Sequence, residues 1–358
     1  MLDYRLTRFN KLTRPELALW DRLQREYPEF ESPYFRPEFT QVVASVRDDV
    51  EVCVIEKEGH AVGFFPFQRD VFNLGKPVGG KLNDFHGVIV PRDVEVNAEE
   101  LISACRLSSW DFDHLVGNQD SFYDHSEIDD ESAYLDLSHG FEGYCEERKK
   151  AGTEVVRKTI SRGRKFMREV GDLTFEYNSR NETVLPTLIR WKVEQFHRTG
   201  FMNLFAFPWT ETLLRNILAG NTPGLSGVLS VLWHGDQPIA ISYMLRSFDI
   251  GHAWFIAYDQ AHATYSPGMV LFLKIAEEGA KQGLTRVHLG AGDQRFKQSL
   301  ASGTVQVGIG AVETRSVSTF ARHAWRWTRD AVATTAWLSF LQRPIEFLQP
   351  VRSWMAFR

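Results

Sequence analysis

Apolar and polar positions alternate in two long stretches of the chain, and each stretch predicts a β-hairpin. Residues 50–65 give a strand, a glycine-containing turn and a second strand, and residues 227–242 repeat this pattern. Further along, residues 112–117 parallel residues 286–291 at nearly the same offset. Because order and spacing agree, the pattern predicts two tandem copies of one α/β unit, although many α/β domains share such hairpins.

A helical period of apolar positions surrounds the hairpins. Thr13-Arg14-Pro15-Glu16 is typical of a capping box with proline at the first helical position, and it predicts a helix that runs to about Tyr27. The second half is predicted to contain helices at 184–199 and 210–219, strands at 227–233, 238–247 and 251–258, a helix at 267–282, and strands at 285–290 and 305–314. The predicted fold class is therefore α/β (α+β), with a reduced first copy.

A basic helix is predicted between the two halves. The expected organisation is an N-terminal unit at 1–138, a connecting helix at 139–170, a C-terminal unit at 171–318 and an amphipathic tail at 319–358. Between residues 148 and 168, the only acid of the helix is Glu154, against nine basic residues: Arg148, Lys149, Lys150, Arg157, Lys158, Arg162, Arg164, Lys165 and Arg168. Its basic face is either simply solvated or directed at an anion, and the pattern leaves both interpretations open.

Composition and charge exclude several classes of protein. Hydrophobic residues make up 43% and charged residues 24% of the 358 residues, which is ordinary for a globular protein with two domains. A net charge of −5 argues against a protein that coats DNA. We expect a cytoplasmic location, because the chain lacks a signal-peptide pattern and an apolar run that could span a bilayer. The spacing of its three cysteines predicts no metal site.

The segment Tyr265-Ser266-Pro267-Gly268 follows a predicted strand and opens a predicted helix. Proline presets the first turn, so three backbone amides are expected to point out of the helix start, those of Gly268, Met269 and Val270. A helix start carries about half a positive charge and binds phosphate well. We therefore predict that this segment holds the pyrophosphate of acetyl-CoA or another acyl-CoA, as a cosubstrate rather than a permanent cofactor. A simple helix cap is the alternative.

The loop that follows the predicted strand at 285–290 carries candidate chemistry. Lys297 could stabilise the oxyanion of a tetrahedral acyl intermediate, or it could neutralise phosphate together with Arg295. Asp293 could accept a proton from an acceptor ammonium. Tyr258, at the end of an earlier strand, is the third catalytic candidate. An exposed loop with surface ion pairs is the alternative interpretation.

The side chains predicted to contact the acceptor come from both halves of the chain: Asp84, His86, Trp191, Tyr243 and Asp259. Trp191, beside Lys192, and Tyr243 are expected to line the cavity or its wall. Asp84 and His86 lie in a polar segment and are expected to reach the acceptor across a cleft between domains, unless this segment is an ordinary loop. His288 lies within a predicted strand and is interpreted as a core histidine rather than a catalytic base.

Several motifs together resemble those of the CelD/BcsL-type GNAT acyltransferases: Gly63-Phe64-Phe65-Pro66-Phe67, Trp110 to Leu115, Tyr258-Asp259, Tyr265 to Gly268, and Gly292-Asp293 with Phe296 to Ala301. The family is similar to the Fem peptidyltransferases, which also pair two GNAT-like halves. The resemblance implies tandem GNAT domains, acetyl-CoA as donor, and a role in bacterial cellulose or exopolysaccharide biosynthesis. It also implies a role in transfer for Lys297, which follows an aromatic residue as in the Fem enzymes.

Two other functions stay open at this point. One is a Fem-type transferase that uses charged tRNA, with the basic helix holding RNA phosphates. The other is a non-catalytic GNAT fold that scaffolds a polysaccharide synthase complex. The expected acceptor is a small molecule or a saccharide precursor. The tail at 319–358 interleaves arginines with aromatic residues, so it either packs on the second domain or contacts a membrane surface or a synthase complex.

Overall fold

The computed structural model of the protein describes residues 1–116, 119–291 and 295–314. The chain forms two compact units that alternate along the sequence. Unit 1 contains Met1–Tyr27, Val43–Asp129 and, among the described residues, 308–314, whereas unit 2 contains Pro28–Val42 and Asp130–Val307. The sequence predicted a simple succession of domains, and it gave no sign that residues 28–42 fold with the second half.

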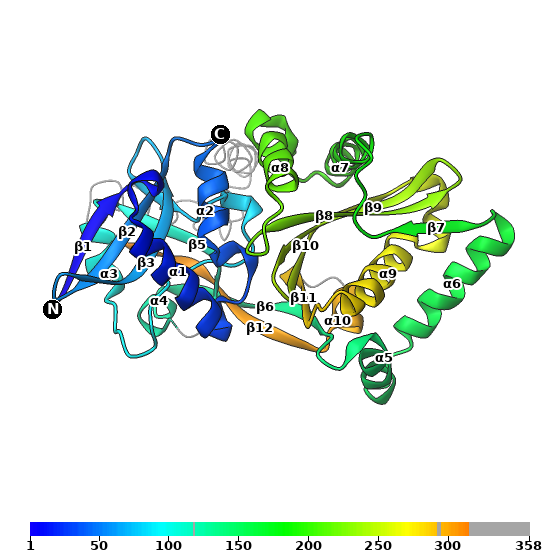
Figure 1. The fold of residues 1–358 in the computed structure, drawn as a ribbon, viewed down its shortest axis with the longest axis horizontal. Coiled ribbons are helices and arrows are strands. Elements are labelled where there is room, and N and C mark those ends of the chain that lie inside the picture. The colour runs from blue at the N-terminus through cyan, green and yellow to red at the C-terminus, as the bar shows by residue number, and fades with distance from the viewer. Residues whose placement is uncertain (117–118, 292–294, 315–358) are drawn as a thin grey trace, which may run out of the picture. The chain divides into compact units, whose positions relative to one another are not determined.

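Unit 1 is built on a mixed sheet with short helices (Figure 1). Its elements are β1 (Leu2–Thr7), η1 (Phe9–Lys11), α1 (Arg14–Glu26), β2 (Val50–Lys57), β3 (His60–Arg69), β4 (Leu74–Lys76), η4 (Gly80–Leu82), α3 (Ala98–Ala104), β5 (Ser109–Val116) and α4 (Asp120–Tyr123). The predicted hairpin is confirmed by the antiparallel pairing of β2 with β3. The predicted capping box is also present, since Thr13 and Glu16 bond each other's backbone amides.

Unit 2 carries the element order expected for the second half. It contains η2 (Pro28–Phe30), η3 (Pro33–Phe35), α5 (Gly140–Lys150), α6 (Val155–Glu169), β7 (Leu173–Glu176), α7 (Val184–Thr199), η5 (Leu204–Ala206), α8 (Pro208–Gly220), β8 (Ser226–His234), β9 (Gln237–Ser247), β10 (Ile250–Tyr258), η6 (Gln260–Tyr265), α9 (Pro267–Lys281), β11 (Arg286–Ala291) and α10 (Arg295–Leu300). Three further elements have residues in both units: α2 (Pro37–Ala44), β6 (Ser126–Asp136) and β12 (Gly303–Glu313).

The strands of unit 2 run in the order β6-β11-β10-β9-β8-β7. β10 and β11 are parallel, whereas the other neighbouring strands in this order are antiparallel. Figure 1 shows α7 and α8 on one side of β8, β9 and β10, and α9 on the other side. Both faces of this sheet are therefore covered, which explains why β8 and β9 are buried along almost their whole length. Among the described residues, no helix has the length and apolarity needed to cross a membrane.

The single connecting helix predicted at 139–170 is wrong, because the chain breaks there into α5 and α6. Gly152 lies between them with a φ of +77°, a left-handed conformation that ends the first helix. Neither helix stands apart from unit 2. Tyr144 of α5, and Val156 and Phe166 of α6, are buried in the same core as α9. The basic side chains of α6 consequently lie on the outer face of a packed helix, whereas Arg148 of α5 is buried.

Replacing Gly152 with alanine should destabilise unit 2 by about 1–2 kcal/mol, because a Cβ disfavours the left-handed conformation. Gly220 is a matched control, since a Cβ at either position meets no atom within 4 Å and the φ of Gly220 is not positive. Gly220→Ala should be neutral or stabilise by up to about 1 kcal/mol. Chemical unfolding of both variants measures the difference, and equal effects would contradict a helix break at Gly152.

Candidate functional site

The parallel strands β10 and β11 are paired only where they begin. Ile250, Gly251 and His252 pair with residues 286–288, and no later parallel pair occurs in the described part of β11. Immediately beyond, β10 carries an irregularity between Ala253 and Phe255 in its pairing with β9. The rest of β10, up to Tyr258, has β9 on one side and an open edge on the other. The sheet therefore splits at this point, and backbone groups along the open edge are left for another partner.

A cavity of about 550 Å³ lies at this split, and we call it the splay cavity. Its walls are residues 253–258 of β10, Leu289 of β11, one stripe of α7, the first turns of α9, and Lys297 of α10. The α7 stripe consists of Trp191, Lys192, Gln195 and Arg198. Because α7 and α9 cover opposite faces of the sheet, the cavity has one wall on each face (Figure 1).

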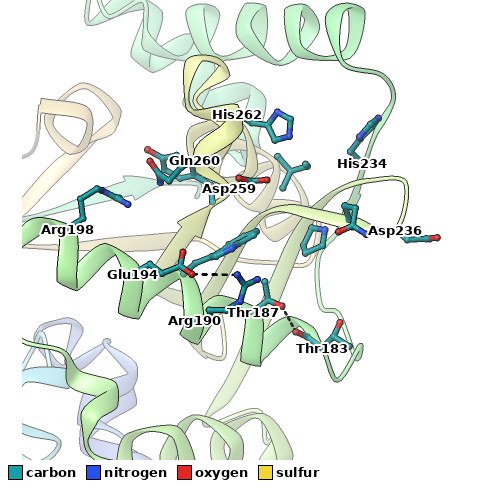
Figure 2. Close-up of a pocket in the computed structure, with 15 residues that line it drawn as sticks. Thr183, Thr187, Arg190, Glu194, Arg198, His234, Asp236, Asp259, Gln260 and His262 are labelled. Atoms are coloured by element: carbon teal, nitrogen blue, oxygen red, sulfur yellow. Dashed lines mark hydrogen bonds and ion pairs between the residues drawn. The ribbon is translucent and has the colours of Figure 1, made fainter.

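A second cavity of about 680 Å³, here called the hairpin cavity, adjoins the first (Figure 2). Four residues line both cavities: Trp191, Arg198, Tyr258 and Gln260. Figure 2 shows polar side chains reaching into the hairpin cavity from three directions: Thr187, Arg190 and Glu194 of α7, His234 and Asp236 of the β8–β9 hairpin, and Asp259 and His262 near η6. Of these, the sequence had indicated only Asp259, although the polar stripe of α7 at helical spacing was a usable signal.

Asp259, predicted to bind the acceptor, also shapes the backbone. Its carboxylate accepts a hydrogen bond from the amide of Ala261 at 2.9 Å and so caps η6. The side chain nevertheless lines the hairpin cavity. On the α7 wall of this cavity, Arg190 Nη1 lies 3.6 Å from Glu194 Oε1. The hairpin cavity thus combines both signs of charge with hydroxyl and amide groups.

The start of α9 offers fewer free amides than the sequence predicted. Met269 and Val270 both donate their N–H groups to the carbonyl of Ser266, at 3.0 and 3.2 Å, because the first turn is tight after Pro267. Among the described residues, only Gly268 of the three predicted amides makes no such bond. The Val270 side chain is buried in the core, so the prediction for Val270 is wrong, whereas Ser266, Gly268 and Met269 do line the splay cavity.

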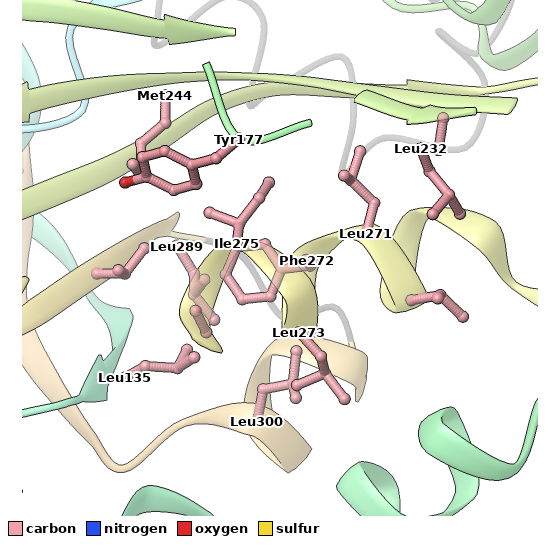
Figure 3. Packing of buried hydrophobic residues seen from close by; sticks show 14 of the residues in the cluster. Leu135, Tyr177, Leu232, Met244, Leu271, Phe272, Leu273, Ile275, Leu289 and Leu300 are labelled. Carbon is pink, nitrogen blue, oxygen red and sulfur yellow. The ribbon is translucent and has the colours of Figure 1, made fainter. Parts of the chain in front are cut away.

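The α9 wall is held rigidly by the core beneath it. Figure 3 shows Leu271, Phe272, Leu273 and Ile275 pointing from α9 into this core. On one side they meet side chains of β8 and β9, among them Leu232 and Met244. On the other side they meet Leu135 of β6 and Leu300 of α10. The burial of each such side chain stabilises the folded state by roughly 1.5–3 kcal/mol. Packing therefore fixes the helix start beside the cavity.

Tyr265 and Ser266 are held by α6. The Tyr265 ring stacks on Phe166 with ring centroids 4.5 Å apart, and its hydroxyl donates to Glu169 Oε2 at 2.8 Å. The hydrogen bond to Glu169 raises the pKa of Tyr265. Arg162 Nη1 donates to Ser266 Oγ at 3.2 Å. Tyr265 therefore positions the turn before α9 and does not line the splay cavity, whereas Arg162 brings the basic face of α6 to the edge of that cavity.

Lys297 belongs to the short helix α10 and not to the loop that the sequence predicted. Its Nζ donates to the carbonyl of Gly290 at 3.2 Å, and the side chain lines the splay cavity together with Tyr258 and Trp191. Gly290 has a φ of +74°, so the strand turns sharply just before the lysine-bearing helix. Asp293 lies outside the described residues, as does the side chain of Arg295, and their predicted roles stay predictions.

Tyr243 does not line either cavity. Its ring is fully buried, and its hydroxyl donates to the carbonyl of Leu214 at 2.9 Å. Burial raises the pKa of this phenol well above its ordinary value. The neighbouring Ser242 lines the splay cavity instead. Successive side chains of a strand point to opposite faces of the sheet. Ser242 therefore faces the cavity, and Tyr243, one residue later, faces the core.

Asp84 and His86 belong to unit 1. His86 is buried, and its Nε2 accepts hydrogen bonds from the amides of Asp113 and His114 at 3.2 and 3.1 Å. Burial lowers the pKa of His86 to about 3, so the ring is neutral and supports the backbone of β5. This structural role differs from the predicted contact with the acceptor. Asp84 is half-buried in the same unit, and its contact with an acceptor stays a prediction.

His288 is confirmed as a core histidine. Its ring is buried, and its Nε2 lies 2.9 Å from Glu31 Oε1. Burial lowers the pKa of His288 to about 4, so it is neutral near pH 7. Glu31 also pairs with Arg286 at 2.5 Å and comes from the segment Pro28–Val42. Through Glu31, this segment therefore fixes the position of the first residues of β11.

Residues 155–298 match the family model described as an acetyltransferase (GNAT) domain. They form a GNAT acetyltransferase domain. The match begins at α6 and ends within α10, so it contains every element that lines the splay cavity. The enzyme class predicted from the sequence, an acyltransferase, is thereby confirmed. No curated protein matches the chain in sequence.

Three solved structures share the fold over most of this chain. FemX superposes with a TM-score of 0.54 at 9% identity, covering 86% of this chain and 96% of its own. The C-terminal domain (DUF2156) of a putative lysylphosphatidylglycerol synthetase from Agrobacterium fabrum gives 0.52 at 12% identity, with 86% and 94% covered. A tandem GNAT protein from the clavulanic acid biosynthesis pathway gives 0.50 at 10% identity, with 87% and 98% covered. At these identities the likeness concerns the fold alone, and it confirms the predicted tandem architecture.

Proposed function

We propose that this protein transfers an acetyl or other acyl group from acyl-CoA to an amine or hydroxyl of a small acceptor. The observation that carries the proposal is the splay cavity, which has the open edge of β10, the free amide of Gly268 and the Lys297 side chain around one space. The pantetheine arm of CoA contains amide groups, which can hydrogen-bond to the edge of β10 beyond its pairing with β11, as a neighbouring strand would.

The donor phosphates are assigned to the α9 side of the cavity. The N–H of Gly268 and the positive end of the α9 dipole attract a pyrophosphate there. Arg162, bonded to Ser266, adds a positive charge at the same edge. With the phosphates at α9, the thioester would lie between β10 and β11, near Tyr258 and Lys297.

In the proposed reaction, the acceptor nitrogen or oxygen attacks the thioester carbonyl, and a tetrahedral oxyanion forms. Collapse of this intermediate breaks the C–S bond and leaves the acyl group on the acceptor. Lys297 would stabilise the oxyanion, since a fixed positive charge at a developing negative charge lowers the barrier. Tyr258 would donate a proton to the departing CoA thiolate, and Asp293 would accept the proton that the acceptor loses.

For the acceptor we propose a cytoplasmic saccharide precursor of cellulose or another bacterial exopolysaccharide. The resemblance of the Tyr265 to Gly268 and Phe296 to Ala301 motifs to the CelD/BcsL-type enzymes supports this assignment. The hairpin cavity adds a physical argument, because its hydroxyl, carboxylate and guanidinium groups suit a polyhydroxylated ligand. Trp191 and Tyr258, which line both cavities, would then separate the donor from most of the acceptor.

A second candidate is a Fem-like transferase that takes its acyl group from aminoacyl-tRNA. The exposed basic face of α6, with Arg157, Lys158, Arg164, Lys165 and Arg168, favours this reading, and Arg162 connects that face to the cavity edge. Transfer from acetyl-CoA in the absence of RNA supports the first candidate. Activity that requires charged tRNA and falls steeply with salt supports the second.

Replacing Gly268 with aspartate should weaken acetyl-CoA binding by more than tenfold, about 1.4 kcal/mol, because a carboxylate would face the pyrophosphate. Gly268→Ala is the matched control: its Cβ would lie 3.2 Å from Tyr258 Cδ1, and the aspartate Cβ would be equally crowded. Calorimetry should therefore show a small loss for alanine and a large one for aspartate. Equal losses, or none, would refute the pyrophosphate placement.

Lys297→Ala should slow acyl transfer by about 10²–10³-fold, which is the usual effect of removing one oxyanion-stabilising group. The loss of its hydrogen bond to Gly290 should change stability by only about 1 kcal/mol. Lys274→Ala is the control, because Lys274 is an exposed lysine of α9 paired with Glu277. Product formation and melting temperature should be measured on both variants. If Lys297→Ala keeps full turnover, the lysine has no part in transfer.

The tail at 319–358, which lies outside the described residues, is proposed to dock on an anionic membrane surface or a synthase complex. Its interleaved arginines and aromatic residues support the proposal. Full-length protein should sediment with anionic vesicles, whereas a chain ending near Ser318 should remain in the supernatant. If both forms stay in the supernatant and the shorter one melts lower, the tail is core packing and the membrane proposal is wrong.

A further inference from the structure

The splay cavity has a pronounced charge imbalance. Its described lining includes three cationic side chains, Lys192, Arg198 and Lys297, and no carboxylate. The hairpin cavity differs in this respect, since Glu194, Asp236 and Asp259 accompany its arginines. Cationic side chains around a partly desolvated cavity attract an anion, because desolvated charges interact more strongly than exposed ones.

Lys192 is the cation with the most unusual surroundings. Its Nζ donates to Gln195 Oε1 at 3.0 Å and lies 5.0 Å from the Phe196 ring centroid and 5.9 Å from that of Phe255. No carboxylate of the described residues pairs with it. Burial alone lowers the pKa of this amine to about 8. Keeping a half-buried ammonium without a counter-ion costs free energy, which a bound anion would offset.

The location of Lys192 separates it from the proposed phosphate site. Lys192 and Arg198 belong to α7, whereas Ser266 and Gly268 belong to the α9 side of the sheet (Figure 1). An anion at Lys192 is therefore not the donor pyrophosphate, if the donor phosphates lie at α9 as proposed. Trp191, Trp254 and Phe255 supply an apolar wall beside the amine. The α7 end of the cavity thus combines a cation with aromatic surface, on the side left for the acceptor.

We propose that Lys192, assisted by Arg198, binds a carboxylate of the acceptor. The acceptor class would then be an amine or alcohol that also carries a carboxylate, such as an amino acid or an amino-uronic acid. The inference rests on the proposed function, because it assumes that the donor occupies the α9 side. Lys192 acts here as a binding and positioning residue, and it holds the nucleophile of the acceptor toward the thioester.

The binding has a defined pH dependence. Only the ammonium form of Lys192 pairs with a carboxylate, and its pKa of about 8 places the loss of this form within a testable range. A bound carboxylate favours the charged form and raises that pKa. The KM for a carboxylate-bearing acceptor should therefore rise as pH increases through 8 and beyond. The KM for a neutral acceptor should lack this contribution.

The first test measures the anion site without any turnover. Full-length protein is labelled with an amine-acetylating reagent, and mass spectrometry follows the labelling rates of Lys192 and of the control Lys274. Phenylacetate and glucuronate serve as anionic probes, with phenylacetamide and glucose as their neutral twins. At least one anion should slow labelling of Lys192 about tenfold when it saturates the site, which needs only competitive occupancy. Lys274 should be unaffected. Equal rates with every probe would overturn the proposal.

The second test separates this inference from the proposed function. Calorimetry with acetyl-CoA examines the donor site, and Lys192→Met should bind acetyl-CoA as the wild type does. If wild-type protein fails to bind acetyl-CoA, the proposed function is wrong, and the labelling result alone decides whether the anion site exists.

If the protein turns over, the KM of each acceptor is measured. Lys192→Met should raise the KM for a carboxylated acceptor about tenfold and leave the KM for its neutral twin unchanged. Lys192→Arg should recover much of the loss. Phenylalanine with phenethylamine, and 2-amino-2-deoxyglucuronate with glucosamine, are suitable pairs. If Lys192→Met raises the KM equally for the carboxylated and the neutral acceptor of a pair, the proposal is wrong.

Discussion

The separation of β10 from β11 is the constraint on which the rest of unit 2 depends. The two strands are held together at their beginnings by a buried cluster. The rings of His252 and His288 stack with centroids 5.6 Å apart, and Glu31 bonds His288 and Arg286. Beyond that cluster, the irregularity of β10 and the turn at Gly290 direct the strands apart. The open edge of β10, the splay cavity and the position of Lys297 all follow from this divergence.

Parallel strands normally continue their ladder, because an unpaired strand edge inside a domain leaves polar backbone groups unsatisfied. Here the cost is confined to a few residues and coincides with the first turn of α9, whose side chains are anchored in the core. The core around α9 therefore holds the walls of the splay cavity in place without filling the cavity. The charges around this opening are also unequal: the splay cavity is cationic among the described residues, and the adjoining hairpin cavity is mixed. This asymmetry is what allows a donor side and an acceptor side to be distinguished.

Local sequence patterns predicted the elements that local physics determines. The two hairpins, the capping box at Thr13 and the helix that follows Pro267 depend on neighbouring residues, and each is present. Features set by distant contacts were missed. The burial of Tyr243 depends on which face of β9 meets α8. The bonding of the Met269 and Val270 amides is a local effect that was also missed, because the pattern around Pro267 does not show how tightly the first turn winds. Gly152 was visible in the sequence, but a basic amphipathic pattern on both sides concealed the break. Nothing local shows that Glu31 joins a strand more than two hundred residues away.

The central claim is that the gap between β10 and β11 receives the acyl donor. Amide hydrogen exchange of the full-length protein, with and without acetyl-CoA, tests it most directly. Residues 253–258 expose the open edge of β10, so a pantetheine arm bonded there should slow their exchange, and residues 266–270 at the start of α9 should be protected with them. Unit 1 should change little. Slower exchange confined to unit 1, or no change at residues 253–258 under conditions where acetyl-CoA is bound, would contradict the account.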